Sequence, residues 1–194
     1  MYESFFQYIK RYTSIPLAEN EVELIEKSFI PRKFKKRQFF LQEGDVCKYT
    51  AFIVKGAMRQ YRVDDDGEHI IKLYIENWWA NDRESFMNQS PSKYFIDAWE
   101  DTEALLLTKA AKINLVDSIP ALSEWIRILD ANFAIAAQRR LNAAISFSAE
   151  ERYHDLEENY PEFLQRFPQQ IIASYLGITR ETLNRIITQQ AKQQ

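Results

Sequence analysis

The feature that most constrains the fold is a stretch near the C-terminus, residues 169–189, which reads QQIIASYLGITRETLNRIITQ. Pro168 precedes it and suits the first turn of a helix, where a missing N–H costs nothing. Gly177 follows Leu176 and supplies the left-handed residue at which many helices end. Thr179 is a favourable N-cap for a second helix. The stretch is therefore predicted to form two short helices separated by a sharp turn.

The spacing of small and apolar residues predicts that the two helices cross closely. Ala173 and Gly177, four residues apart, provide a small side chain at the crossing point and a residue that tolerates positive φ. Leu183 and Ile186 then close the small core between the helices, with Ile178 buried in the turn. This is the spacing of a helix-turn-helix, whose second helix enters the major groove in DNA-binding proteins. An ordinary helical hairpin with a solvated outer face is the alternative.

The outer side of the second helix carries side chains of the kinds that read base pairs. Arginine can donate two hydrogen bonds to guanine O6 and N7, and glutamate can accept one from cytosine N4. The segment 163–194 has four basic residues and one acidic residue, a net charge of +3, so the rest of the chain carries −6 of the total of −3. The candidate DNA-binding residues are Thr179, Arg180, Glu181, Asn184 and Arg185.

Composition excludes several classes of function. A single cysteine, Cys47, rules out an intramolecular disulfide framework and a cysteine-ligated metal site within one chain. His69 and His154 lie far apart without a partner pattern, so neither a metal nor a cofactor is predicted. No nucleophile–base or paired-carboxylate arrangement stands out, so we do not expect an enzyme. No signal peptide or transmembrane-length apolar run is evident, and we expect a cytoplasmic protein without a membrane partner.

The first half of the chain is predicted to be two short helices followed by a barrel of antiparallel strands. The helices fall within residues 1–12 and 16–29, and from Ile30 the pattern changes to short strands. Turn signals at 43–45, 55–56, 66–67 and 101–102 separate these strands and favour a barrel or jelly roll. The basic run at 32–37 resembles a nucleic-acid patch, but its interleaved phenylalanines fit an edge strand with one solvated face.

A long helix is predicted from Pro120, with apolar residues at alternating three- and four-residue steps. A seam of this length exceeds what one small barrel needs, so we interpret it as a homodimer contact around a two-fold axis. Packing on the chain's own barrel is the alternative. After it, residues 148–160 form a helix that ends before Pro161, with a short link into the helix-turn-helix. The predicted dimer-helix residues are Leu122, Ile126, Leu129, Phe133 and Ala136.

The order of these parts resembles the Crp/Fnr superfamily of bacterial transcription regulators, over about residues 20–190. The likeness rests on Gly44-Asp45, on FIVKG at 52–56, on the long helix, and on SYLGITRETLNRI at 174–186. It implies a jelly roll of the cyclic-nucleotide-binding type that senses a signal, a homodimer, and paired helix-turn-helix units that bind double-stranded DNA. In the family an arginine, a glutamate and a second arginine contact bases, and Arg180, Glu181 and Arg185 match them.

Two departures from the family pattern matter. Members that bind cyclic AMP hold its phosphate with a helix that opens Gly-Glu and with an Arg-Ser pair, where this chain has Asn81-Asp82 and Ser92-Lys93. We therefore expect that cyclic AMP is not the ligand. Arg83 or Lys93 could hold another anion, and Trp78, Trp79 and Tyr94 could line an apolar pocket; simple packing in a ligand-free barrel is the alternative. The candidate pocket residues are Trp79, Asn81, Asp82, Arg83, Ser92 and Lys93.

The second departure is at the C-terminal end, where only seven residues follow Ile187 and no C-terminal wing is expected. Phosphate contacts would then come from Lys192, Arg166 or the start of the first motif helix.

The sequence therefore predicts an α+β regulator with three parts: a sensor barrel with N-terminal helices (1–116), a dimer helix (117–147) and a DNA-binding helical domain (148–194). A small-molecule effector has a place in this scheme, but the sequence does not identify it. The alternative is a small-molecule or protein-binding module that uses the same barrel and does not bind DNA.

Overall fold

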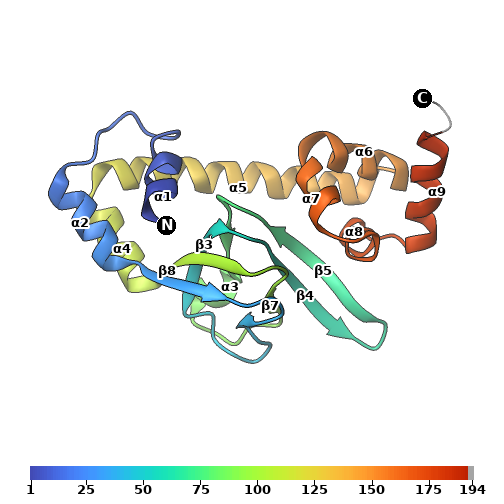
Figure 1. Ribbon diagram of the computed structural model, residues 1–194, viewed down its shortest axis with the longest axis horizontal. Coiled ribbons are helices and arrows are strands. Elements are labelled where there is room, and N and C mark those ends of the chain that lie inside the picture. The colour runs from blue at the N-terminus through green and yellow to red at the C-terminus, as the bar shows by residue number, and fades with distance from the viewer. Residues whose placement is uncertain (192–194) are drawn as a thin grey trace.

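The computed structural model describes residues 1–191 as a β-barrel flanked by helices at both ends and spanned by one long helix (Figure 1). Two helices precede the barrel, one lies within it and six follow it. The helices are α1 (Tyr2–Ile9), α2 (Glu19–Ser28), α3 (Arg83–Asn88), α4 (Lys109–Ser118), α5 (Pro120–Ser146), α6 (Ala149–Asn159), α7 (Pro161–Arg166), α8 (Gln169–Leu176) and α9 (Arg180–Gln190). The strands are β1 (Ile30–Phe34), β2 (Phe39–Leu41), β3 (Tyr49–Lys55), β4 (Met58–Asp64), β5 (Gly67–Tyr74), β6 (Trp79–Ala80), β7 (Phe95–Ala98) and β8 (Thr102–Thr108).

The barrel is a jelly roll of two four-stranded antiparallel sheets, as predicted. Their strand orders are β1-β8-β3-β6 and β2-β7-β4-β5. The predicted turns between β3 and β4 and between β4 and β5 are present, with Gly56 at φ 97° and Gly67 at φ 112°. A Cβ at Gly56 would lie 2.6 Å from the Oγ1 of Thr102, so only glycine allows the β3–β4 turn to lie against the start of β8.

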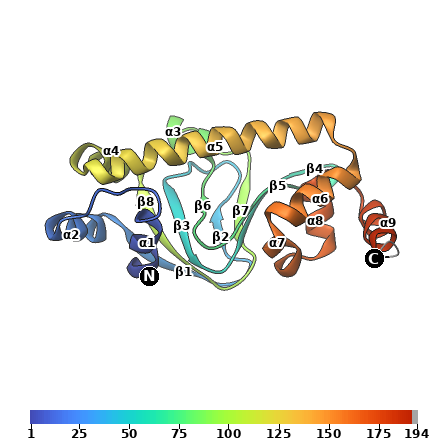
Figure 2. The same ribbon diagram turned by 90° about the horizontal axis from the view of Figure 1, so that it is seen from above.

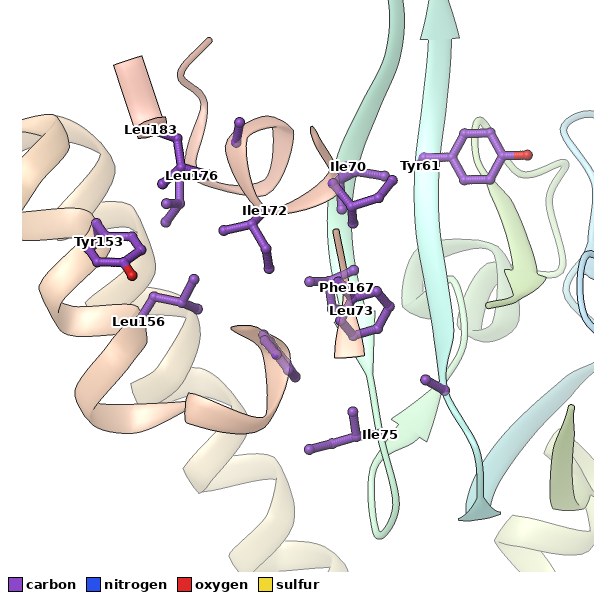
Figure 3. Packing of buried hydrophobic residues seen from close by; sticks show 14 of the residues in the cluster. Tyr61, Ile70, Leu73, Ile75, Tyr153, Leu156, Phe167, Ile172, Leu176 and Leu183 are labelled. Carbon is purple, nitrogen blue, oxygen red and sulfur yellow. The ribbon is translucent and has the colours of Figure 1, made fainter. Parts of the chain in front are cut away.

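Three apolar clusters hold the molecule together. One fills the inside of the barrel, between its two sheets. A second joins α1 and α2 to the outer side of β3 and β8 and to the start of α5. The third is shared by β4 and β5 with the C-terminal helices, and Figure 3 shows Ile70, Leu73 and Ile75 on the strand side of it and Leu156 and Ile172 on the helix side. The C-terminal helical unit therefore packs directly on the barrel.

The solvent exposure of helix α5 changes along its 27 residues. Its first third lies against the barrel and α4, with Leu122 and Trp125 each 2% exposed. Beyond Asp130 it is exposed almost throughout, and it runs alongside the C-terminal helices (Figure 2). The long helix with Pro120 in its first turn was predicted, and its second half contacts the rest of the chain through a few side chains, among them Phe133 and Arg140.

Several element boundaries differ from those expected. The two N-terminal helices are shorter than predicted, and Pro168 is the N-cap of α8 rather than a residue of its first turn. The link before the helix-turn-helix is itself a helix, α7, with Pro161 in its first turn. No strand follows α9 within residues 1–191. None of the helices formed by these residues has the length and hydropathy that crossing a membrane requires.

Candidate nucleic-acid interface and sensor region

The turn between α8 and α9 has the geometry that the sequence predicts. Gly177 ends α8 in the left-handed region at φ 67°, and the N–H of Ile178 donates to the carbonyl of Ala173 over 3.0 Å. Thr179 caps α9, because its Oγ1 accepts from the N–H of Thr182 over 3.2 Å. Leu183 is fully buried between the helices. Ala173 and Gly177 therefore bring two helices together around one apolar contact, although Ile178 is only partly buried.

The outer face of α9 is open to solvent. Within residues 1–191, no hydrogen bond or ion pair of the chain engages the side chains of Arg180, Glu181, Asn184 or Arg185, and all four residues are exposed. Thr179 is exposed as well, but its hydroxyl oxygen already serves as the cap. Helix α9 thus places two guanidinium groups, a carboxylate and an amide on one accessible side, close to its N-terminus.

The helical unit as a whole is not positively charged, although the outer face of α9 carries two exposed arginines. Residues 148–191 contain four arginines and seven acidic residues, a net charge of −3, because α6 is strongly acidic. Arg166 is also not free to contact phosphate, since it is paired with two carboxylates of the barrel. Our suggestion of a phosphate contact by Arg166 is therefore wrong, and Lys192 lies outside the described residues.

The start of α3, where the resemblance places a ligand phosphate, is occupied by the chain's own carboxylate. Asp82 is 5% exposed, and its Oδ1 accepts from the N–H of Glu84 and the N–H of Ser85 over 3.1 and 3.4 Å. Its Oδ2 accepts from the hydroxyl of Ser92 over 2.8 Å, and Ser92 is 3% exposed. The two groups that would have held a phosphate therefore hold each other, because a helix N-terminus is satisfied by any carboxylate placed there.

Beside α3, cationic side chains surround an aromatic ring of α5. Arg83 pairs with Asp130 over 3.0 Å and lies 4.7 Å from the ring centre of Phe133. Lys72 of β5 lies 5.0 Å from the same ring, and Arg140 donates to the carbonyl of Ile71. Burial lowers the pKa of Lys72, and the charge of Arg140 lowers it further. Sequence reasoning missed Lys72, although a lone lysine in the apolar run HIIKLYI was a visible signal.

The remaining pocket candidates do not form one cavity lining. Trp79 belongs to the cluster with α1 and α5, whereas Trp78 contacts Tyr160 and Phe163 of the C-terminal helices. The Nδ2 of Asn81 donates to Thr50 over 3.1 Å, and Lys93 is exposed. The two tryptophans face different parts of the molecule, so the shared apolar pocket is corrected to packing.

The predicted dimer residues of α5 mostly face the chain's own barrel. Leu122 is buried within the chain, and Ile126 and Leu129 pack against the same cluster. Phe133 contacts Lys72 and Arg83 as described, and Ala136 lies one turn further along the exposed part of the helix. Leu122 is therefore covered by the chain itself, whereas Ile126 and Leu129 are only partly covered by it. Other apolar side chains of α5 are exposed: Ile135 at 51%, Leu141 at 62% and Ile145 at 77%.

Cys47 is a buried thiol, as interpreted from the sequence. It is 1% exposed, its Sγ lies 3.2 Å from the carbonyl oxygen of Tyr49, and burial raises its pKa to about 11. A thiol in this state is not a reactive nucleophile at neutral pH. His69 lies 2.7 Å from Asp64 and His154 lies 3.6 Å from Glu157, each on the exposed surface.

Comparison with known proteins identifies a domain family and several solved structures that resemble this chain. Residues 31–118 match the cyclic nucleotide-binding domain family. Among solved structures, FixK2 from Bradyrhizobium japonicum is similar at 18% identity with a TM-score of 0.68, covering 85% of both chains. The c-di-GMP responsive global regulator CLP from Xanthomonas campestris is similar at 15% identity with a TM-score of 0.68, covering 91% of this chain and 93% of CLP.

A third similar structure, from Eubacterium rectale, is of a protein assigned to the Crp/Fnr family of transcriptional regulators. It shares 17% identity with a TM-score of 0.63 and covers 89% of this chain and 82% of that chain. Among curated proteins, none matches this chain.

Proposed function

Because residues 31–118 match the cyclic nucleotide-binding domain family and the chain has the fold of the Crp/Fnr regulators, we propose that this protein is a dimeric, sequence-specific DNA-binding transcription regulator. The observation that carries the proposal is the outer face of α9. A stable helix presents Arg180, Glu181 and Arg185 to solvent without partners in the described chain, in the groups that base edges accept. These three side chains are therefore available to bind a partner molecule outside the chain.

Dimerisation follows from the second half of α5. Ile135 and Ile145 lie on the side of the helix that points away from Leu122 and Leu129, and Leu141 lies on its flank, since successive residues turn by about 100°. An exposed apolar stripe on a long helix is stabilised by a matching copy, which also gives the two-fold symmetry that a palindromic operator needs. In this proposal the three domains keep the predicted ranges, with residues 117–147 as the dimer helix.

The sensor barrel does not take cyclic AMP in this proposal. A cyclic phosphate at the start of α3 would have to displace the carboxylate of Asp82 from two backbone N–H groups and from Ser92. It would also leave that carboxylate buried without partners, which is unfavourable.

Salt dependence of binding to a labelled DNA duplex tests the proposal against the alternative of a docking module without DNA binding. Fluorescence anisotropy at two salt concentrations should show affinity falling steeply as salt rises, because phosphate contacts release counterions. An affinity that does not change with salt concentration, or no binding even at low salt, would overturn the proposal. Calorimetric titration with cyclic AMP and cyclic GMP should give no binding heat, and micromolar binding would contradict the interpretation of Asp82.

Ile145→Glu tests the dimer contact, because it places a charge in the proposed apolar stripe without touching the barrel. Analytical ultracentrifugation should show that this variant is a monomer. Thermal unfolding should show that the stability of the barrel is unchanged. Leu129→Ala, on the barrel side, should leave the dimer intact.

A further inference from the structure

Three turns of the barrel meet around one residue of the C-terminal helical unit, Arg166 at the end of α7. Its guanidinium donates to Glu100 twice, from Nε over 3.1 Å and from NH2 over 2.7 Å, and it also pairs with Glu76. The indole N–H of Trp99 donates to the carbonyl of Arg166 over 3.2 Å. We call this group, Arg166 with Glu76, Trp99 and Glu100, the Arg166 clamp.

One carboxylate of the Arg166 clamp, that of Glu76, is also held by the barrel. An oxygen of Glu76 accepts from the N–H of Gly56 over 2.7 Å, and the N–H of Trp99 donates to the carbonyl of Ala57 over 2.8 Å. Partial burial raises the pKa of Glu76, but hydrogen bonds from Arg166 and from Gly56 outweigh it, so the pKa is below its ordinary value. The planar fork of arginine donates to the two carboxylates from separate nitrogens in a fixed geometry, which the single ammonium nitrogen of lysine does not provide.

A second attachment lies on the free edge of β5. The hydroxyl of Ser174 in α8 accepts from the N–H of Ile70 over 2.9 Å and donates to the carbonyl of Glu68 over 3.2 Å. Between this edge and the Arg166 clamp lies the apolar cluster that the two parts share (Figure 3). The helical unit is thus fixed at two separate polar points as well as through its core, and these contacts together restrict its orientation.

We propose that Arg166 is a positioning residue for DNA recognition: the Arg166 clamp holds the helical unit at one angle to α5, and so sets the distance between the two α9 helices of a dimer. The proposal rests on the proposed function. Helix-turn-helix dimers bind half-sites whose separation mirrors the separation of their recognition helices. Fixing the helical unit on the barrel therefore makes the protein selective for one half-site spacing, while the base preference within each half-site belongs to α9.

Measured affinities for operators whose half-site spacing varies by one or two base pairs test this role. Wild-type protein should prefer one spacing. Arg166→Met should shrink that preference by about fivefold, the ratio that about 1 kcal/mol represents, and leave base preference within a half-site unchanged. Equal loss of affinity at every spacing would overturn the proposal, because it would indicate a phosphate contact or a general loss of folded protein.

The double variant Glu76→Gln with Glu100→Gln separates positioning from charge. It should broaden spacing tolerance in the same direction as Arg166→Met, since either change breaks the Arg166 clamp. If Arg166 instead served DNA phosphate, freeing it from two carboxylates would strengthen binding at all spacings, and that outcome would contradict us. Arg62→Met is the matched control: it removes one positive charge from a pair with Asp64 that lies entirely within the barrel.

Hydrogen exchange of the free protein gives a readout that needs no DNA. Amides of α7 and α8 should exchange at least about fivefold faster in Arg166→Met than in wild type, while those of β3 and β8 stay unchanged. Unchanged exchange in α7 and α8 would overturn the Arg166 clamp even where DNA binding is intact. Faster exchange in a protein that binds no DNA would keep the clamp as an attachment and refute the proposed function together with the role in spacing.

Discussion

Two helices of this chain begin with nearly the same four residues and use them in opposite ways. Helix α3 starts Asp82-Arg83-Glu84-Ser85, and α9 starts at Thr179 with Arg-Glu-Thr following. Each has a cap, then arginine, then glutamate. In α3 the cap is buried and bonded to Ser92, and the arginine is paired with α5. In α9 the cap is exposed and the arginine is open to solvent.

The contrast shows that the chemistry of a helix start is decided by what the fold places opposite it. The cap of α3 lies inside the molecule beside Ser92, and Arg83 pairs with Asp130 of α5, so both side chains are satisfied within the chain. The start of α9 projects from the end of the helical unit, where no other part of residues 1–191 reaches its outer face. One helix start therefore contributes stability, and the other is available for binding.

The strongest effect should be on stability, from the cap of α3. Asp82→Ala removes this cap and leaves the buried hydroxyl of Ser92 without its acceptor, so unfolding should become easier by about 3 kcal/mol. Thr179→Ala removes only an exposed cap and should cost about 1 kcal/mol. Urea denaturation measures both. Equal losses would mean that Asp82 is not the buried centre we describe.

The next effect is on DNA binding. Arg180→Ala should weaken binding to the preferred site by about 1–3 kcal/mol and relax its sequence preference, because a bidentate contact to guanine is lost. Arg83→Ala, at the equivalent position of α3, should leave DNA affinity unchanged. Competition binding with single-base variants of the site distinguishes base contact from phosphate contact. Uniform weakening across all sequences would place Arg180 on the DNA backbone.

A smaller effect should appear in the stability of the same two arginine variants. Arg83→Ala should lower the free energy of unfolding by about 1 kcal/mol, because it breaks a partly exposed ion pair and the contact with Phe133. Arg180→Ala should change it by less than about 0.5 kcal/mol, as expected for an exposed residue without partners. Thermal unfolding of the two arginine variants measures both changes in stability. A reversed order would contradict the contrast between α3 and α9.

The smallest effect concerns pH and the link between the two ends of the molecule. Glu76 has a folded pKa below its ordinary value of 4.5, so its contribution to stability is complete above that value and is lost as pH falls through the folded pKa. Since the group is partly exposed, this contribution should be less than about 1 kcal/mol. Wild type should therefore lose more stability than Glu76→Gln when pH falls below 4.5. Identical pH profiles would show that the pair with Arg166 contributes nothing.

Local chemistry made the C-terminal motif predictable. Ala173, Gly177 and Thr179 each have one geometric role, and the structure assigns them those roles. The succession of short strands and the turns at Gly56 and Gly67 were likewise predictable, because glycine between two apolar runs is typical of a tight turn.

What the sequence did not reveal depends on contacts between distant residues. The Arg166 clamp joins Glu76, Glu100 and Arg166, which no local pattern connects. The spacing of Leu122, Ile126 and Leu129 also could not reveal that they pack against the chain's own core, since it is the same whether they meet a second copy or the chain itself. The role of Asp82 likewise depends on Ser92, which only the folded barrel brings beside it.

Selection of binding sites from a randomised DNA pool by the purified chain, with no nucleotide added, tests directly whether α9 reads DNA without a cyclic nucleotide. We predict enrichment of a two-fold symmetric sequence, because α9 is exposed and the start of α3 is already occupied by Asp82. The contradicting result is a pool that enriches no sequence, or one that enriches only when cyclic AMP or cyclic GMP is supplied.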